Sequence, residues 1–199
     1  MSLVKWSFSL QNKSDIRKYC LKQRRNILNE ERFVAGLSAV NRLIDTPLFQ
    51  HSQNIACYFA EESEFDCAPI IAAIWGAKKN CFLPILSETN LLKFSAYDSN
   101  TILKFNRYRI LEPETSLHFP AEQLDLVVMP LVGFDLQGHR LGMGGGYYDK
   151  TFQFLHDKTI QKPFLLGLAY ELQKMENIPM DPWDISMDGM LTEEELYFF

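Results

Sequence analysis

The residues best suited to chemistry lie in a glycine-rich stretch of the C-terminal half. Six of the ten glycines fall between Gly133 and Gly146. Consecutive glycines let the backbone adopt positive φ and bring bare N–H groups close to a ligand. The stretch also opens a predicted helix over residues 147–156, whose first N–H groups favour an anion. The pattern predicts a phosphate-binding loop, and a tight turn without a ligand is the alternative.

Charged side chains near this loop and near the N-terminus suit phosphate and metal chemistry. Arg140 stands at the entrance of the loop, and arginine binds phosphate through paired N–H donors. Lys13 and Arg17 are four residues apart, so a helix capped by Ser14 would let both face one anion. A solvated basic helix face is the alternative for this pair. Asp149 follows the loop, where a lone carboxylate ordinarily favours the helix dipole.

The common nucleotide-binding motifs do not fit the loop. Tyr148 and Asp149 stand where a Walker loop carries lysine followed by serine or threonine. Tyr147 stands where the dinucleotide fingerprint has its last glycine, and the loop begins well beyond the preceding strand. The four histidines form no metal-type spacing, and no serine, cysteine or histidine triad is evident. His139, beside Arg140, is interpreted as a surface histidine.

Apolar patterning predicts helices that alternate with strands. Such alternation is typical of a mostly parallel sheet covered on both faces, an α/β fold. We expect one domain over residues 1–199, with no internal repeat or linker. The predicted helices cover residues 14–29, 30–43, 69–79 and 147–156, and the predicted strands cover residues 54–59, 80–84, 91–97, 124–130 and 163–169, with residues 106–120 as a loop.

Composition limits the partners and the compartment of the chain. It has 199 residues and a net charge of −5, which argues against nucleic acid as a main partner. No apolar run approaches the roughly 20 residues that span a bilayer, and residues 1–6 lack the core of a signal peptide. The four cysteines show no zinc-type spacing and are expected to be reduced and mostly buried. We therefore expect a cytoplasmic protein without a membrane partner. A monomer is also expected, although composition does not address the oligomeric state.

Several segments resemble one enzyme family. The run Arg-Leu-Gly-Met-Gly-Gly-Gly-Tyr-Tyr-Asp at residues 140–149 resembles the signature of the 5-formyltetrahydrofolate cyclo-ligase (5,10-methenyltetrahydrofolate synthetase) family. Residues 128–138 are also similar to it, and residues 179–188 are similar to its acidic C-terminal segment. Lys13 and Arg17 match its N-terminal basic pair, and Glu64 matches its acidic residue after the first strand. The resemblance covers nearly the whole chain.

The resemblance implies a single-domain three-layer α/β/α sandwich and a reaction that uses ATP and Mg2+. ATP would phosphorylate the formyl oxygen of 5-formyltetrahydrofolate, and N10 would then attack the activated carbon to give 5,10-methenyltetrahydrofolate. The catalytic residues implied are Arg140, Lys13 and Arg17. The implied ATP-binding residues are Lys13, Ser14, Asp15, Ile16, Arg17, Arg140, Leu141, Gly142, Met143, Gly144, Gly145, Gly146, Tyr147 and Tyr148.

The resemblance also implies metal and folate contacts. The implied metal ligands are Asp149 and Asp184, with Asp181 and Asp188 as competitors for the second position. The implied folate contacts are Phe59, Glu64, Met143, Gly144, Gly145, Gly146 and Tyr147. The alternatives left open are a core role for Phe59 and a folate contact by Glu61, Glu62 or Asp66 in place of Glu64.

The chain departs from the family pattern within the loop. Met143 and Gly145 stand where many relatives carry a basic residue, and Lys150 stands where arginine is common. This difference keeps open a non-catalytic nucleotide- or folate-binding module of the same fold. An isomerase or transferase acting on a sugar phosphate or thioester is a third alternative, against which the basic pair and the Tyr147-Tyr148-Asp149 ending argue.

Overall fold

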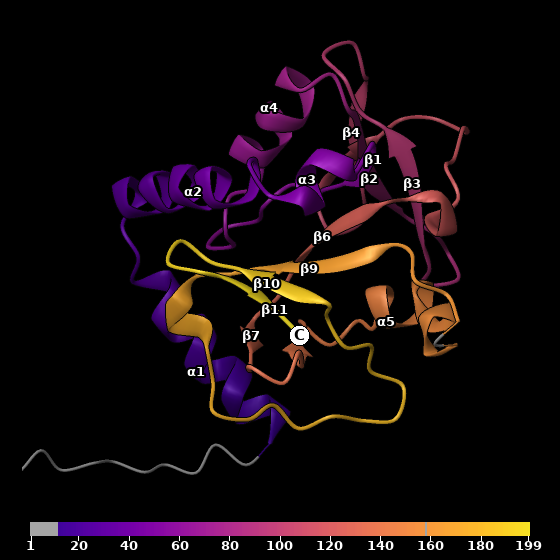
Figure 1. The fold of residues 1–199 in the computed structure, drawn as a ribbon. Coiled ribbons are helices and arrows are strands. Elements are labelled where there is room, and N and C mark those ends of the chain that lie inside the picture. The colour runs from indigo at the N-terminus through magenta and orange to yellow at the C-terminus, as the bar shows by residue number, and fades with distance from the viewer. Residues whose placement is uncertain (1–11, 158) are drawn as a thin grey trace, which may run out of the picture.

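A seven-stranded sheet forms the centre of the computed structural model, which describes residues 12–157 and 159–199 (Figure 1). Residues 1–6, examined above for a signal peptide, lie outside the described residues. The strand order is β11-β10-β9-β6-β1-β2-β3. Its strands are β1 (Asn54–Ala56), β2 (Asn80–Leu86), β3 (Leu92–Ala96), β6 (Leu126–Pro130), β9 (Phe164–Leu168), β10 (Gly189–Leu191) and β11 (Leu196–Phe198).

The inner strands of this sheet are parallel, and its two edge strands are antiparallel. Strands β10, β9, β6, β1 and β2 run in one direction, whereas β3 and β11 run against their neighbours. The predicted mostly parallel sheet is therefore confirmed. Strand β6 shows why its sequence is a continuous apolar run: Leu126 and Val128 pack on one face, and Val127 and Met129 pack on the other.

Helices cover both faces of the sheet, so the molecule has the three layers expected of the sandwich (Figure 1). One face carries α2, α3 and α4, whose apolar residues share a core with Leu126 and Val128. The other face carries α1 and α5, with Phe152 after α5 in the core of Val127 and Met129. The helices are α1 (Lys13–Arg25), α2 (Asn29–Leu43), α3 (Pro47–His51), α4 (Ala68–Gly76) and α5 (Tyr147–Thr151), with 3₁₀ turns at Ala121–Gln123, Gln153–His156 and Glu171–Gln173.

The start of α1 differs from the prediction. Asn12 is the N-cap, and its side-chain oxygen accepts a hydrogen bond from the backbone N–H of Asp15 at 3.0 Å. Ser14 therefore lies inside the first turn, so its predicted role as the N-cap was wrong. The shift places Lys13 in the helix, where it stands one turn before Arg17 on the same side.

Two other predicted elements are shorter in the structure. The predicted strand 54–59 ends at Ala56, and the chain then leaves the sheet. The predicted helix 147–156 is α-helical only as far as Thr151 and continues as a 3₁₀ turn from Gln153. A helix of five residues has a weak dipole, so the glycine stretch before it depends more on nearby cations to hold an anion.

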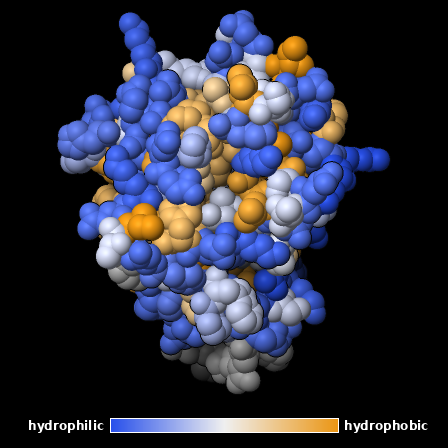
Figure 2. All heavy atoms as spheres, turned by 90° about the vertical axis from the view of Figure 1, so that its right-hand side faces the viewer, coloured by the Kyte–Doolittle hydropathy of each residue, from blue (hydrophilic) through white to orange (hydrophobic). Residues whose placement is uncertain are grey.

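Two small hairpins complete the fold. Strands β4 (Leu103–Phe105) and β5 (Leu111–Pro113) pair in an antiparallel way, so the predicted loop 106–120 contains a strand. Strands β7 (Gly133–Phe134) and β8 (Arg140–Leu141) form the other hairpin, directly before the glycine loop. Figure 2, seen from the side of β3 and β4, shows hydrophobic groups in the middle of this face with hydrophilic ones around them.

The cysteines are buried, as expected from the sequence. Cys20, Cys57, Cys67 and Cys81 are free and buried. Among residues 12–157 and 159–199, each helix is too short or too polar to span a bilayer.

Candidate active site

A cavity of about 860 Å³ opens at the carboxyl ends of the parallel strands. The residues that follow β1, Tyr58 and Phe59, line it together with Leu131 after β6 and Leu86 at the end of β2. Ligands of open parallel sheets bind at this edge, because the loops after the strands converge there. The volume falls within the range of small-molecule sites, about 300–1,000 Å³.

The glycine loop, residues 142–146, forms one wall of this cavity. Gly144 has φ 105° and Gly146, the N-cap of α5, has φ 65°, values that disfavour any side chain. A Cβ at Gly145 would lie 2.7 Å from the ring of Tyr147. The glycines are therefore required by the shape of the loop, which also brings its backbone to the cavity surface.

Arg140 lies beneath this loop and is almost fully buried. One Nη of Arg140 donates a hydrogen bond of 2.5 Å to Oδ1 of Asp149, and its guanidinium lies 6.0 Å from the ring centre of Tyr148. Within the described part of the chain, the buried Nε of Arg140 has no hydrogen-bond partner. A buried N–H group without a partner is unfavourable, so this donor is poised for an acceptor that a ligand can bring.

Lys13 reaches the same cavity from the start of α1. Its Nζ donates a hydrogen bond of 2.6 Å to Asp181 and a second, shorter one to Asp184. Burial alone would lower the pKa of Lys13, but the two carboxylates more than offset it and raise the pKa. Lys13 is therefore positively charged, and it lies beside the carboxylates of Asp181 and Asp184.

Arg17 completes the cationic group one turn later in α1. Its Nε donates a hydrogen bond of 2.7 Å to the carbonyl oxygen of Gly142. The other predicted contacts in this turn lie elsewhere: Ser14 and Asp15 are exposed, and Ile16 is buried in a small apolar core with Cys20. Lys13 and Arg17 line the cavity, whereas Ser14, Asp15 and Ile16 stay predicted contacts outside its lining.

Glu64 and Phe59 lie on the cavity wall formed after β1. Burial raises the pKa of Glu64, while a backbone hydrogen bond from Glu61 and the charge of Arg24 lower it in part. Phe59 is half-buried and meets the ring of Tyr97 edge-on, with ring centres 5.3 Å apart. A carboxylate beside an aromatic ring can bind a flat heterocycle that carries N–H donors.

Tyr147 joins the glycine loop to the tip of the β4–β5 hairpin. Its hydroxyl lies 2.9 Å from the hydroxyl of Tyr108 and accepts a hydrogen bond of 3.0 Å from Arg107. Met143, in the same loop, is exposed and lines the cavity as well. Tyr148 is partly buried, lines the cavity too and packs against the core of Val127 and Met129, and burial raises the pKa of its hydroxyl. Both tyrosines thus line the cavity, and Tyr148 also packs on the core.

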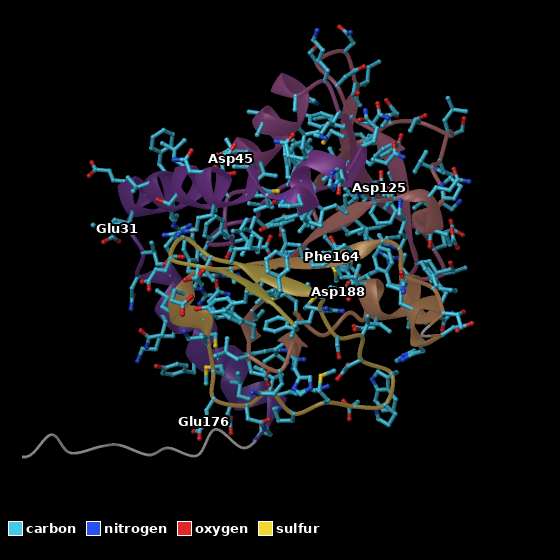
Figure 3. All side chains as sticks on the ribbon, in the orientation of Figure 1. Glu31, Asp45, Asp125, Phe164, Glu176 and Asp188 are labelled. Atoms are coloured by element: carbon cyan, nitrogen blue, oxygen red, sulfur yellow. The ribbon has the colours of Figure 1, made fainter. Side chains whose placement is uncertain are left out.

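The acidic side chains considered as alternatives to Glu64 and Asp184 fall into two groups, one that lines the cavity and one that does not. Glu61, Glu62 and Asp181 line the cavity. Asp66, just before α4, accepts a hydrogen bond from the backbone N–H of Ala68 at 2.9 Å. Asp188, labelled in Figure 3 beside Phe164, accepts from the N–H of Leu165 at 2.7 Å and lies outside the cavity lining. Asp66 and Asp188 thus serve the fold, which leaves Asp181 as the competitor of Asp184.

Asp149 and Asp184 are positioned as a pair of carboxylates near the glycine loop. Asp149 accepts from the backbone N–H of Ile185 at 3.2 Å, so it lies next to Asp184 in space. Residues 12–157 and 159–199 contain no group of three or more histidine, cysteine or acidic side chains able to hold a metal. A cation bound here would need ligands from a substrate in addition to the carboxylates.

Some residues of the cavity were not singled out from the sequence. Arg24 lines its floor, and Tyr108 and Trp183 reach its mouth from distant segments. Arg24 is one of several cations in α1, so its spacing does not single it out, and nothing local marks Tyr108. His139, interpreted as a surface histidine, is partly exposed and contacts the buried Asp135 at 2.9 Å. It is absent from the cavity lining.

Comparison with known proteins now identifies the family. The model of the 5-formyltetrahydrofolate cyclo-ligase family matches residues 9–193. The chain belongs to this family. It is 34% identical to the 5-formyltetrahydrofolate cyclo-ligase of Haemophilus influenzae over 91% of this chain and 97% of that protein. It is 35% identical to the enzyme of that name from Escherichia coli K12, over 89% of this chain and 98% of that protein.

Solved structures agree with the family assignment. The 5,10-methenyltetrahydrofolate synthetase of Aquifex aeolicus superposes with a TM-score of 0.81 at 32% identity, covering 94% of this chain and 92% of that one. A Mycoplasma pneumoniae structure, with a TM-score of 0.71 at 24% identity, shares the fold. The resemblance inferred from residues 140–149 and the expected α/β fold are confirmed, and the chain is an enzyme of the ligase class.

Proposed function

We propose that the chain converts 5-formyltetrahydrofolate to 5,10-methenyltetrahydrofolate with ATP, releasing ADP and phosphate. One observation carries the proposal: a single cavity holds a glycine loop with Lys13, Arg17 and Arg140 and also a wall with Glu64 and Phe59. The first part suits a phosphate chain, and the second suits an aminopyrimidine ring. The family to which the chain belongs supports the same reaction.

The chemistry requires activation of a poor electrophile. The formyl oxygen attacks the γ-phosphorus of ATP, a new P–O bond forms, and ADP leaves. N10 of the folate then attacks the activated carbon, forms the new C–N bond and loses its proton, and the C–O bond breaks to release phosphate. Phosphoryl transfer of this kind depends mainly on positioning and charge neutralisation, so no protein nucleophile is needed.

The residues of the cavity have matching roles. Arg140 binds the transferring phosphate through its paired donors, including the Nε that is unpartnered among the described residues. Lys13 and Arg17 neutralise the remaining phosphate charge, and the loop backbone from Leu141 to Tyr148 cradles the chain. Glu64 accepts N–H donors of the pterin, whose ring lies against Phe59 and residues 143–147.

Magnesium fits the carboxylates of this cavity. Among the described residues, the partners of Asp149 reach only Oδ1 and those of Asp184 reach only Oδ2, so one oxygen of each is available. Magnesium typically uses one or two carboxylates and completes its shell with phosphate oxygens and water. Bound between Asp149, Asp184 and ATP, it would supply further neutralisation of phosphate charge. Asp181 is the competing second ligand.

The replaced loop cations favour one alternative, a non-catalytic module that binds nucleotide or folate. Because Met143 and Gly145 carry no charge, neutralisation of the phosphates depends on Arg140, Lys13 and Arg17. All three line the cavity, so the cationic set needed for turnover is present. We also propose that the chain acts as a cytoplasmic monomer of one domain.

A coupling experiment tests the function. Purified protein is incubated with ATP, magnesium and 5-formyltetrahydrofolate, and phosphate release and the near-ultraviolet absorbance of the methenyl product are followed together. We expect both products in a one-to-one ratio, and neither when any component is omitted. ATP hydrolysis without folate would indicate an unrelated ATPase. Binding of both ligands with neither product would favour the non-catalytic module.

A further inference from the structure

Arg24 is a buried cation on the floor of the cavity, and the proposed reaction gives it no role. It lies in α1, two turns beyond Arg17, and is 4% exposed. It also lines the cavity. Burying an arginine is unfavourable unless it is well hydrogen-bonded or paired, so its surroundings should reveal what it stabilises.

The guanidinium of Arg24 joins α1 to two loops of the active site. Its Nε donates to Oγ of Ser63 at 3.1 Å, and one Nη donates to the carbonyl oxygen of Leu131 at 3.2 Å. Ser63 belongs to the turn that carries Glu64, and Leu131 follows β6. Arg24 therefore connects the helix of the phosphate-binding cations to the wall proposed for the folate.

The turn at residues 61–64 holds Glu64 by one oxygen only. The N–H of Glu64 donates to the carbonyl of Glu61 at 2.7 Å, and the N–H of Glu61 donates to Oε2 of Glu64 at 3.1 Å. From α2, Arg32 donates to the carbonyl of Glu62 at 2.7 Å. Two arginines thus fix this turn, but only Arg24 lines the cavity.

The charges around Glu64 give Arg24 a second effect. Burial raises the pKa of Glu64, and Arg24 lowers it, whereas the like charge of Glu61 raises it. Tyr58, after β1, and Tyr148, in α5, also face Glu64, but burial raises the pKa of both hydroxyls, so they stay neutral. Arg24 is therefore the cation that favours the ionised carboxylate.

We propose that Arg24 is a positioning residue for folate recognition, which holds the 61–64 turn and keeps Glu64 an acceptor of pterin N–H groups. The proposal rests on the proposed function, since it assigns Glu64 to the folate. Arg24 acts through Glu64 and touches neither substrate. A purely structural arginine would affect stability and both substrates alike, whereas this role separates folate from ATP.

The test compares Arg24→Gln with Arg32→Gln, which removes the same charge from the same turn but outside the cavity. For Arg24→Gln we expect the KM for 5-formyltetrahydrofolate to rise about tenfold or more, with nucleotide affinity by calorimetry changed less than about twofold. The acid limb of kcat/KM for the folate should move to higher pH, because Glu64 then ionises at higher pH. Arg32→Gln should leave that limb in place.

Two further variants keep the test decisive if Arg24→Gln folds poorly. Arg24→Lys retains the positive charge but lacks the paired donors of the guanidinium. It should therefore keep the acid limb of kcat/KM at its wild-type position while the KM for the folate stays raised. Ser63→Ala removes one acceptor of Arg24 and should raise KM modestly without moving the limb. The proposal would be overturned if Arg24→Gln weakened the use of ATP and of the folate equally, or if it left the acid limb of kcat/KM for the folate unchanged.

A readout without turnover separates this inference from the function itself. Carboxyl NMR of the ligand-free protein should show a higher pKa for Glu64 in Arg24→Gln than in wild type. An unchanged pKa would refute the electrostatic part of the role of Arg24 even in a fully active ligase. A wild-type protein without folate-dependent turnover, but with the shifted pKa, would instead refute the proposed function.

Discussion

Two aspartates at opposite ends of the parallel strands have equal exposure and opposite surroundings. Asp125 precedes β6 and Asp149 follows the glycine loop, and the side chain of each is 15% exposed. Asp125, labelled in Figure 3, accepts from the N–H groups of Gln53 and Asn54, both at 2.9 Å, and from Lys162 at 2.6 Å. Asp149 pairs instead with the buried Arg140.

The difference distinguishes a carboxylate that holds the fold together from one that lies in the candidate site. The partners of Asp125 are backbone amides that no ligand can replace and a lysine that is 67% exposed. The main partner of Asp149 is a side chain that itself lines the cavity and has a free buried donor among the described residues. Exposure alone therefore says little about function, whereas the identity of the partner says much.

Asp149→Asn should have the largest effect on turnover. The amide oxygen can still accept from Arg140 and Ile185, so the fold should remain, but a neutral ligand binds magnesium weakly. We expect turnover to fall by about 100-fold or more, as several kcal/mol of charge stabilisation are lost. Turnover across a magnesium titration measures this. Unchanged activity and magnesium dependence would remove Asp149 from the metal site.

Arg140→Ala should weaken the use of ATP, and Lys162→Ala is its control at the opposite edge. A charge-assisted phosphate contact contributes roughly 1.5–3 kcal/mol, so the KM for ATP should rise about 10- to 100-fold. The KM for the folate should change much less, and Lys162→Ala should leave both values unchanged. Steady-state kinetics with each substrate varied in turn gives the answer. A normal KM for ATP beside a raised KM for folate would contradict the assignment.

Glu64→Gln should act on the folate alone. The amide presents a donor where the pterin also presents donors, and one unpaired buried polar group costs about 1–3 kcal/mol. We expect the KM for 5-formyltetrahydrofolate to rise about tenfold, with nucleotide binding by calorimetry nearly unchanged. Asp66→Asn alters a carboxylate two residues away outside the cavity and should leave the folate KM intact. Equal loss of both ligands would indicate misfolding.

Asp125→Asn should affect stability and leave kinetics unchanged. Burial alone would raise the pKa of Asp125, but its bonds to Lys162, Asn54 and Gln53 lower it. A lowered folded-state pKa means that this stabilisation is present above the unfolded pKa of about 3.9 and is lost as pH falls through the folded-state value. At pH 7 we expect Tm to fall by roughly 2–8 °C, with wild-type kinetics. As pH falls below the unfolded pKa of about 3.9, the two melting curves should approach each other.

The sequence predicted the inner sheet well because its strands are continuous apolar runs. Residues 124–130 and 163–169 stand out in this way, and the structure places β6 and β9 there. The last two strands, β10 and the edge strand β11, were missed because each has only three residues. So short a segment carries too little apolar pattern to be recognised locally, and its strand conformation depends on the neighbour with which it pairs.

In the candidate site, the parts formed by adjacent residues were predicted, and the parts formed by distant residues were not. The glycine loop and Arg140 are recognisable from adjacent residues, and the structure adds Lys13 and Arg17 to the same cavity. Arg24 and Tyr108 were missed because their partners, Ser63 and Tyr147, lie 39 residues away in each case. Only the folded chain brings such pairs together.

The ion pairs of Lys13 with Asp184 and of Arg140 with Asp149 have a consequence for how ligands enter. In the proposed reaction, the phosphates of the nucleotide would draw the two cations away from the carboxylates, and the metal ion would neutralise the carboxylates that they leave. A nucleotide bound without the metal would leave partly buried carboxylates without a partner, which is unfavourable. Both ligands together would exchange the partners, so that each charge stays neutralised. We therefore expect nucleotide and metal to favour each other's binding to the same degree, because such coupling is reciprocal.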